Sequence, residues 1–248
     1  MPLLAKGLLF VSALASIYLS CLELTTTVKF ADILYISSEA TAHIKSLPEI
    51  LREYSPAVDQ IRDGNVCRSD IIRAGLDISL AELDSESADR DFEAWLLSIQ
   101  RAQRMVQHAI QCGPTTSEYW TRYAMISFAG GENSMGLASL LNRAVMLDPT
   151  NTGALRARFS IWRKLSSDSL SIAGGALNSD LQTLLTYGGK AEMRDILSPI
   201  STSMRPYVIM RFCKLDLDRR ARLLRWGFEP SGDKSISSNS SEICSLEH

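Results

Sequence analysis

The chain has 248 residues, of which 46% are hydrophobic and 22% are charged. This balance supports a packed core and excludes a globally disordered chain. The formal net charge of −2 argues against a dedicated nucleic-acid binder, which usually carries a strongly basic face. Three histidines and five dispersed cysteines offer few ligands for a metal ion. We therefore predict no metal site, no cofactor and no nucleic-acid partner.

The N-terminal segment predicts a membrane anchor. Residues 7–22 carry no charged side chain, and residues 7–24, which include Glu23, reach the lower length limit for a helix that crosses a bilayer. Lys6 precedes the apolar run and Glu23 follows it, so the positive-inside rule predicts a cytoplasmic N-terminus. We interpret residues 1–28 as a single-pass anchor in the inner (plasma) membrane, with the bulk of the chain on the periplasmic, extracytoplasmic side.

Four other interpretations of the N-terminus stay open. Ala13-Leu14-Ala15 resembles the cleavage site of a secretory signal peptide, although cleavage there leaves only a short apolar region. Cys21 is a candidate lipidation site, but the preceding Tyr18-Leu19-Ser20 matches that pattern poorly. The segment also fits a buried helix of a soluble protein, or an anchor with reversed topology that leaves the domain facing the cytosol.

A polar, mixed segment follows the anchor. Pro48 and Pro56 interrupt residues 29–66, and Asp63-Gly64-Asn65 is a typical turn sequence at their end. We interpret this segment as a membrane-proximal helical linker.

From Cys67 onward, apolar residues recur three or four positions apart, which is the helical period. No segment shows the alternation typical of strands, so the predicted fold class is all-α, with a helical domain over residues 67–228. The Ser-rich residues 229–248 predict a disordered tail, and the closing Leu-Glu-His resembles an expression-tag remnant. The predicted helices cover residues 67–84, 88–112, 117–129, 134–147 and 153–165 and, with weaker patterning, 177–187, 191–197 and 207–226.

The helical region contains an internal repeat. Ala109–Pro114 aligns with Ala144–Pro149 at a period of 35 residues. Residues 117–151 resemble the tetratricopeptide repeat, whose period is about 34 residues. The chain departs from that family by one extra residue in the turn at 130–134 and by Leu137, where a small residue is usual. The residues that carry the resemblance are Trp120, Ala124, Phe128, Gly131, Ala144 and Pro149.

The resemblance implies a short α-solenoid of about three helical hairpins that works by binding protein partners. Its concave groove would be lined by Tyr119, Arg122, Tyr123, Arg156 and Arg158. More loosely, the layout of an anchor, a Cys-opened helix and hairpins is similar to that of small membrane-anchored bacterial proteins associated with polysaccharide biosynthesis. That similarity implies a non-catalytic scaffold or adaptor in a cell-envelope assembly, with polysaccharide synthesis or export proteins as partners.

Two further features have a structural and a functional interpretation. Cys67 opens one predicted helix and Cys112 closes its hairpin partner, so they are either a disulfide pair or two buried thiols. The basic stretch near the C-terminus is either a solvated capping helix or a docking surface for an acidic partner, an anionic polymer or lipid headgroups. Its candidate docking residues are Arg211, Lys214, Arg219 and Arg222.

The sequence shows no recognisable catalytic pattern. His43 lies in the predicted linker, His108 on a predicted helix and His248 at the terminus, and none adjoins a nucleophile in a known motif. We therefore predict no enzyme and no catalytic residue. The alternative is a soluble or secreted enzyme whose site lies in residues 166–204, and it predicts a deep pocket with perturbed titratable groups there.

Overall fold

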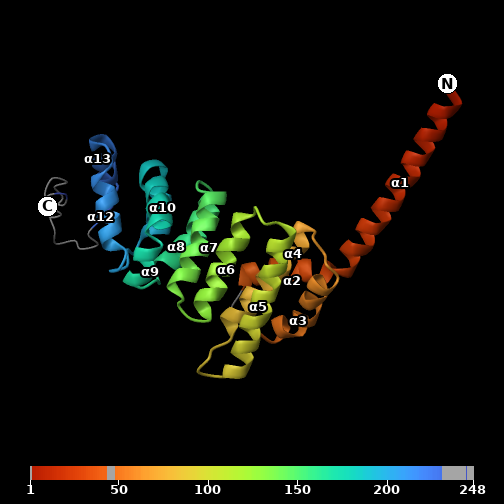
Figure 1. Ribbon diagram of the computed structural model, residues 1–248, viewed down its shortest axis with the longest axis horizontal. Coiled ribbons are helices and arrows are strands. Elements are labelled where there is room, and N and C mark those ends of the chain that lie inside the picture. The colour runs from red at the N-terminus through yellow and green to blue at the C-terminus, as the bar shows by residue number, and fades with distance from the viewer. Residues whose placement is uncertain (1, 44–47, 231–243, 245–248) are drawn as a thin grey trace. The chain divides into compact units, whose positions relative to one another are not determined.

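The described part of the chain is entirely helical in its regular structure. The computed structural model describes residues 2–43, 48–230 and 244. Each regular element in these residues is a helix (Figure 1). The predicted all-α class is therefore confirmed.

The chain divides into two compact units, Met1–His108 and Ala109–His248. The division falls within helix α5 (Phe92–Cys112). The predicted domain limits at residues 28, 66 and 228 stay predictions.

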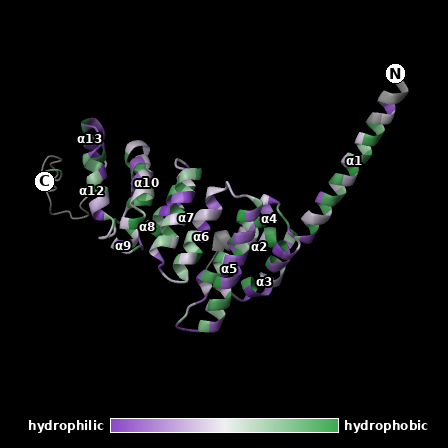
Figure 2. Cartoon of the chain, in the orientation of Figure 1, coloured by the Kyte–Doolittle hydropathy of each residue, from purple (hydrophilic) through white to green (hydrophobic). Residues whose placement is uncertain are grey.

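Helix α1 (Pro2–Lys29) opens the first unit. Its segment Leu9–Lys29 has 21 residues, a mean hydropathy of 1.6 and no buried part, and Figure 2 shows hydrophobic residues along most of the helix. At 1.5 Å per residue this segment is about 31 Å long, which matches the hydrocarbon core of a bilayer. The helix is thus long and apolar enough to cross a membrane, a criterion that a signal sequence near the N-terminus also meets.

Arg68 ties the end of α1 to the rest of the first unit. Its Nη1 donates to Thr27 Oγ1 at 2.7 Å and to Glu23 Oε2 at 3.3 Å. Its Nε and Nη2 donate to the two carboxylate oxygens of Asp70 at 2.8 and 2.9 Å. These hydrogen bonds from Arg68 hold the pKa of Asp70 below its ordinary value. Glu23 lies in the apolar helix α1, and Arg68 is its cationic partner.

Three packed helices follow α1. They are α2 (Ala31–His43), α3 (Pro48–Asp63) and α4 (Ser69–Ser85), and α4 packs against both α2 and α3. The segment predicted as a linker therefore forms part of the core of this unit. The buried apolar side chains include Phe30, Ile33, Leu51, Val58, Ile61, Ile71, Leu76 and Ile78.

Pro56 lies inside α3 and does not end the helix, so the predicted interruption there is wrong. A proline inside a helix removes one backbone hydrogen bond. Burial of Leu51, Val58 and Ile61 against neighbouring helices outweighs that loss. The predicted turn at Asp63-Gly64-Asn65 is present, and Asn65 adopts a positive φ of 48°.

A buried carboxylate joins three helices of the first unit. Glu82 of α4 is 5% exposed and accepts hydrogen bonds from Ser55 of α3 and from Arg101 of α5. Arg101 also lies 3.7 Å from Asp59 of α3. The Glu82 carboxylate therefore has hydrogen-bond partners in the interior. Without them, its burial among apolar side chains would destabilise the fold.

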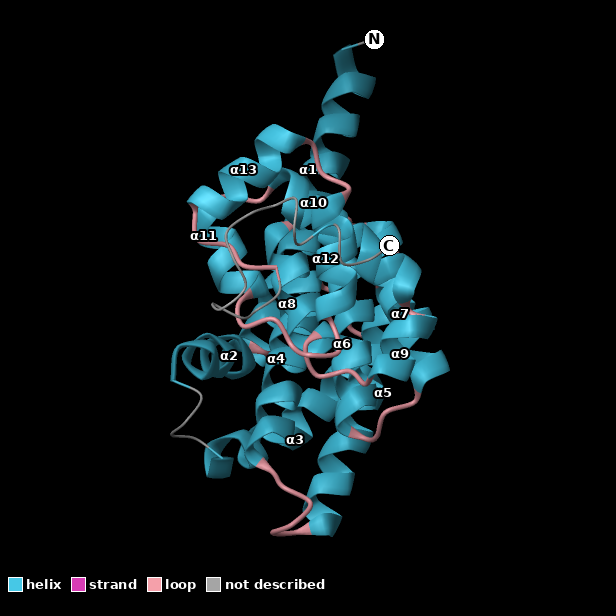
Figure 3. Cartoon of the chain, turned by 90° about the vertical axis from the view of Figure 1, so that its left-hand side faces the viewer, coloured by secondary structure: helices cyan, strands magenta, loops and turns pink. Residues whose placement is uncertain are grey.

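The second unit contains nine helical elements within the described residues, joined mostly by short loops (Figure 3). Helix α8 packs against α6, both α9 and α10 pack against α7, and α12 packs against α10. The elements are α6 (Ser117–Ala129), α7 (Ser134–Leu147), α8 (Thr152–Trp162), α9 (Ser167–Ile172), α10 (Gly174–Tyr187), α11 (Lys190–Glu192), the π-helix η2 (Met193–Leu197), α12 (Arg205–Cys213) and α13 (Leu217–Arg225).

Short polar side chains start several of these helices. Asn133 and Asn151 accept hydrogen bonds from the backbone N–H three residues on and cap α7 and α8. Asp216 caps α13 in the same way by accepting from the backbone N–H of Arg219. The single helix predicted over 207–226 is therefore wrong, because Asp216 begins a new helix after α12 has ended.

The turn between α6 and α7 also supports α9. Gly131 has a φ of 132°, which glycine adopts without strain. The next residue, Glu132, accepts hydrogen bonds from the backbone N–H and the hydroxyl of Ser166, the cap residue of α9. Hydrogen bonds from Ser169 and Ser166 hold the pKa of Glu132 below its ordinary value.

A buried ion pair holds α8 to α10. Arg158 and Asp180 are both 0% exposed, and the guanidinium donates to the two carboxylate oxygens through Nε and Nη2 at 2.8 Å each. Trp162 Nε1 donates to the same carboxylate at 2.9 Å, and Arg158 Nη1 donates to the Asp148 carbonyl at the end of α7. Burial raises the pKa of Asp180, and its bonds from Arg158 and Trp162 oppose that rise.

The substitution Asp180→Asn should destabilise the protein by about 3–5 kcal/mol, because it leaves the Arg158 charge buried without its counter-ion. Urea denaturation of the full-length, detergent-solubilised protein, followed by circular dichroism, measures this. The double substitution Arg158→Met/Asp180→Leu should cost less than Asp180→Asn alone, and a larger cost would contradict a buried charge pair. Asp168→Asn, which alters an exposed carboxylate at the start of α9, is the matched control and should change little.

Glu132 should stabilise the fold in a pH-dependent way. Because its pKa is lowered from 4.5 on folding, its contribution is present above pH 4.5 and is lost as the pH falls through the folded-state pKa. Glu132→Gln should therefore lower the free energy of unfolding at pH 7, by less than about 1 kcal/mol for so exposed a group. The same comparison well below the folded-state pKa should show little difference, and an equal loss at both pH values would contradict this role.

Candidate functional site

An open groove runs over the outer face of α7. We call it the α7 groove, and it has a volume of about 540 Å³. Met135 and Met146 are 71% and 75% exposed, and Ile172 of α9 is also exposed. The groove is lined by Trp120, Met135, Ala138, Ser139, Asn142, Arg143, Met146 and Ile172.

The wall of the groove is held in place by Trp120. Its indole Nε1 donates to the Pro114 carbonyl at 2.8 Å, which fixes the orientation of the ring. The Arg143 guanidinium lies 5.8 Å from the ring centroid in a cation–π contact. Among the residues that the structure describes, no carboxylate pairs with Arg143. The groove thus offers an apolar floor with one cation at its wall.

Sequence reasoning missed this groove, although α7 carried a signal for it. Leu137, Leu141 and Ala144 form the buried stripe of the helix. Met135 and Met146 are large apolar residues that lie off that stripe, so the helical period already places them on the outer face. Large apolar residues on the otherwise polar face of this helix could therefore have predicted an apolar surface there.

Two of the five predicted partner-binding residues are buried in the structure. Arg158 is fully buried in its ion pair, and Tyr119 is 5% exposed, so burial removes both from the predicted set. Arg122 is half-buried and pairs with Glu118 at 2.6 Å. Tyr123 is half-buried and Arg156 is exposed. None of the five lines the α7 groove, and binding by Arg122, Tyr123 and Arg156 stays a prediction.

A second, smaller pocket lies beside Trp226, with a volume of about 270 Å³. Part of its lining falls within residues 166–204, where the alternative interpretation as an enzyme places the catalytic site. Its lining contains no cysteine or histidine. Asp180, whose pKa is shifted, lies in the buried ion pair and does not line this pocket. The lining residues are Lys190, Met193, Arg194, Leu197, Ser198, Pro199, Ile200, Trp226, Gly227, Phe228 and Glu229.

The predicted anionic docking residues divide into two kinds. Arg219 is buried, donates to the Leu185 and Gly188 carbonyls at the end of α10, and lies over the Trp226 ring. Burial lowers its pKa, and the neighbouring Arg222 charge adds to that effect. Arg211 is half-buried and donates to Asn178 and Gln182 of α10.

These bonds give Arg219 and Arg211 a structural role in holding α12 and α13 to α10. Burial makes Arg219 unfit as a docking residue. Lys214 and Arg222 are exposed, and their part in docking stays a prediction.

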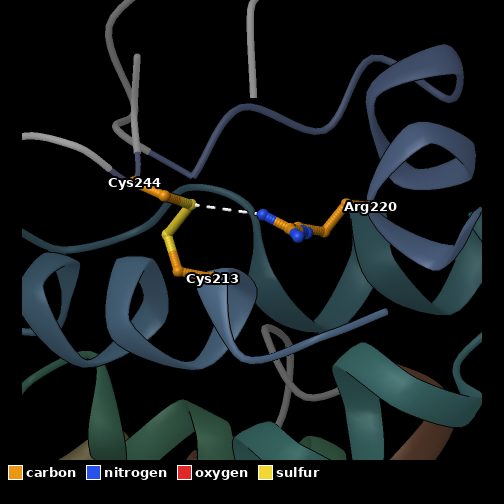
Figure 4. The surroundings of a disulfide bond; sticks show 3 residues. All are labelled: Cys213, Arg220 and Cys244. Atoms are coloured by element: carbon orange, nitrogen blue, oxygen red, sulfur yellow. Dashed lines mark hydrogen bonds between the residues drawn. A yellow bond between two sulfur atoms is a disulfide. The ribbon is translucent and has the colours of Figure 1, made fainter. Parts of the chain in front are cut away.

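A disulfide joins Cys213 at the end of α12 to Cys244, with a Cα–Cα distance of 5.6 Å (Figure 4). Arg220 Nη1 lies 3.7 Å from Cys244 Sγ. Sequence reasoning did not select this pair, because cysteine positions alone allow several pairings. The predicted Cys67–Cys112 pair falls on the two sides of the unit boundary and stays a prediction.

The remaining sequence-level candidates lie in the core or beyond the described residues. His108 is buried on α5, with Nε2 3.0 Å from the Val66 carbonyl. The side chain of His43, and His248 with most of the predicted disordered tail, lie outside the described residues.

Comparisons with known protein families, with curated proteins and with solved structures found no match to this chain.

Arg219→Ala should lower the free energy of unfolding by about 1.5–3 kcal/mol, because it removes a charged donor from two buried carbonyls. Arg222→Ala, three residues on and exposed, is the matched control and should stay within about 0.5 kcal/mol of the unsubstituted protein. Thermal and urea denaturation check both variants. Equal effects of the two substitutions would contradict the division into structural and exposed cations.

Proposed function

We propose that this chain is a non-catalytic, membrane-anchored adaptor that binds a protein partner in the α7 groove. The observation that carries the proposal is the exposure of Met135 and Met146 beside the fixed ring of Trp120. Contiguous exposed apolar side chains are a mark of interaction surfaces. Methionine also adapts its shape to different apolar partners, because its side chain is unbranched and polarizable.

The groove favours an amphipathic helix as the bound segment. Met135, Ser139, Asn142 and Met146 follow one another at the spacing of a single helical face, over about 17 Å of α7. A partner helix would place two or three turns of apolar side chains along this row. A carboxylate on that helix would meet Arg143, which has the Trp120 ring as its neighbour.

The packing of the second unit supports helical-repeat, tetratricopeptide-like architecture. Helices α6 and α7 pack as a hairpin across the Gly130-Gly131 turn. Helix α8 then packs on α6, and α9 packs on α7, as in a stack where each hairpin covers the preceding one. In this proposal the partner binds to the second helix of the hairpin, rather than between the first helices as the sequence resemblance implied.

The anchor and the cysteines support a place at the outer side of the inner (plasma) membrane. Helix α1 has the length and hydropathy for a single span. Lys6 before the apolar run favours an N-terminus in the cytoplasm. The Cys213–Cys244 disulfide favours an oxidising compartment such as the periplasm for the bulk of the chain. The assignment of partners that make or export polysaccharide in the cell envelope rests on the sequence similarity alone.

Site-specific photo-crosslinking in cells tests this function. A photoreactive residue in place of Ser139, within the groove of the full-length membrane-bound protein, should yield an adduct with one discrete partner protein. Met135→Asp/Met146→Asp should reduce that adduct at least about tenfold, because it places two charges on the apolar floor. Both methionines are exposed, so the variant should keep the thermal stability of the unsubstituted protein.

The same photoreactive residue at Arg156, exposed on α8, is the control position. An adduct at Arg156 with none at Ser139 would contradict the α7 groove and return the site to the predicted one. An adduct at Ser139 that is unchanged by the two methionine substitutions would also contradict it.

A further inference from the structure

The start of α5 carries an exposed apolar cluster with an acidic rim. Phe92 is 59% exposed, and Leu96 and Leu97 are exposed as well, within two turns of one helix. The Phe92 ring lies 5.6 Å from the Trp95 ring. We call this surface the acidic tip, and it consists of Asp89, Asp91, Phe92, Glu93, Leu96 and Leu97.

The acidic rim has a net negative charge. Asp89, Asp91 and Glu93 are exposed, and among the described residues none of them forms an ion pair. Asp91 also accepts from the backbone N–H of Ala94 at the start of α5. The nearby Arg90 donates to the Ser85 carbonyl. A partner for this surface must therefore supply positive charge together with an apolar side chain.

The second unit carries a surface of that chemistry. Leu217, at the start of α13, is 71% exposed, and Figure 2 shows α13 as largely hydrophilic. Lys214, Arg222 and Arg225 are exposed, and Asp218 is an exposed carboxylate on the same helix. Among the described residues, none of the three cations forms an ion pair. We call this surface, Lys214, Leu217, Arg222 and Arg225, the basic face.

We propose that the acidic tip of one copy of this chain binds the basic face of a second copy. Three exposed carboxylates lie within a few residues of the apolar cluster of the tip, and three exposed cations lie within eight residues of Leu217. Opposite potentials of this kind steer two surfaces together and set their orientation. Burial of Phe92 against Leu217 removes apolar area from water.

The contact joins two different surfaces, so it is heterologous. In a pair, one copy keeps an unused basic face and the other keeps an unused tip, so a further copy has a matching surface at each of them. This inference does not depend on the α7 groove, whose residues belong to neither surface.

Charge reversal on the full-length, detergent-solubilised protein tests the contact by sedimentation over a wide range of protein concentration. Asp89→Lys/Glu93→Lys reverses the tip and spares Asp91, which caps α5. Arg222→Glu/Arg225→Glu reverses the basic face. Each variant alone should raise the dissociation constant of self-association at least about tenfold, because like charges then face each other.

The decisive sample is an equimolar mixture of the two variants. The reversed tip then meets the reversed face, and the remaining unaltered tip meets the unaltered face, so association should return. Glu49→Lys/Glu53→Lys, two exposed acids near the start of α3, is the matched control and should associate as the unsubstituted protein does. Raised salt should weaken association of the unsubstituted protein, because the charges are exposed to solvent.

Three results would overturn the proposal. They are an unsubstituted protein that stays monomeric at every concentration, a mixture that does not regain association, and a loss of association in the α3 control equal to that in the tip variant.

Discussion

The buried pair of Arg158 and Asp180 fixes how α8 and α10 pack against each other in the second unit. A buried charge without its partner costs several kcal/mol, so α8 and α10 can pack only in the register that brings the guanidinium and the carboxylate together. Arg158 also donates to the carbonyl of Asp148, which ends α7. One polar network thus joins α8 and α10 to the end of α7, the helix that supplies most of the lining of the α7 groove.

The helix pattern was largely predictable where local signals end each element. The bounds predicted for α6 and α7 match the structure, because Gly130-Gly131 and Asp148-Pro149 interrupt the helical pattern. Pro56 misled the prediction, since the burial that keeps α3 intact involves residues of α4 that follow later in the chain. The break at Asp216 was missed because the apolar period continues across it, while one side-chain cap starts a new helix.

The surfaces were less predictable than the helices, because exposure depends on partners far away in sequence. From the sequence, Arg158 is predicted to line a groove. In the structure it is paired with Asp180 of another helix. Arg219 and Arg222 are three residues apart on one short helix, yet only Arg219 reaches the carbonyls that end α10. Sequence supplies the residue type and the helical face. The distant acceptor decides whether an arginine supports the fold or is exposed at the surface.

The Cys213–Cys244 disulfide closes a covalent ring of the chain that includes α13, with the two cysteines 31 residues apart. A single proteolytic cut anywhere inside that ring would leave the two chain ends linked, and reduction of the disulfide would then release the C-terminal piece. Helix α13, which carries the exposed cations, is therefore covalently attached at both ends. The backbone joins its N-terminal end to α12, and the Cys244 disulfide joins the chain that follows it to Cys213. A single cut of the backbone within the 213–244 loop therefore leaves α13 covalently attached to the rest of the chain.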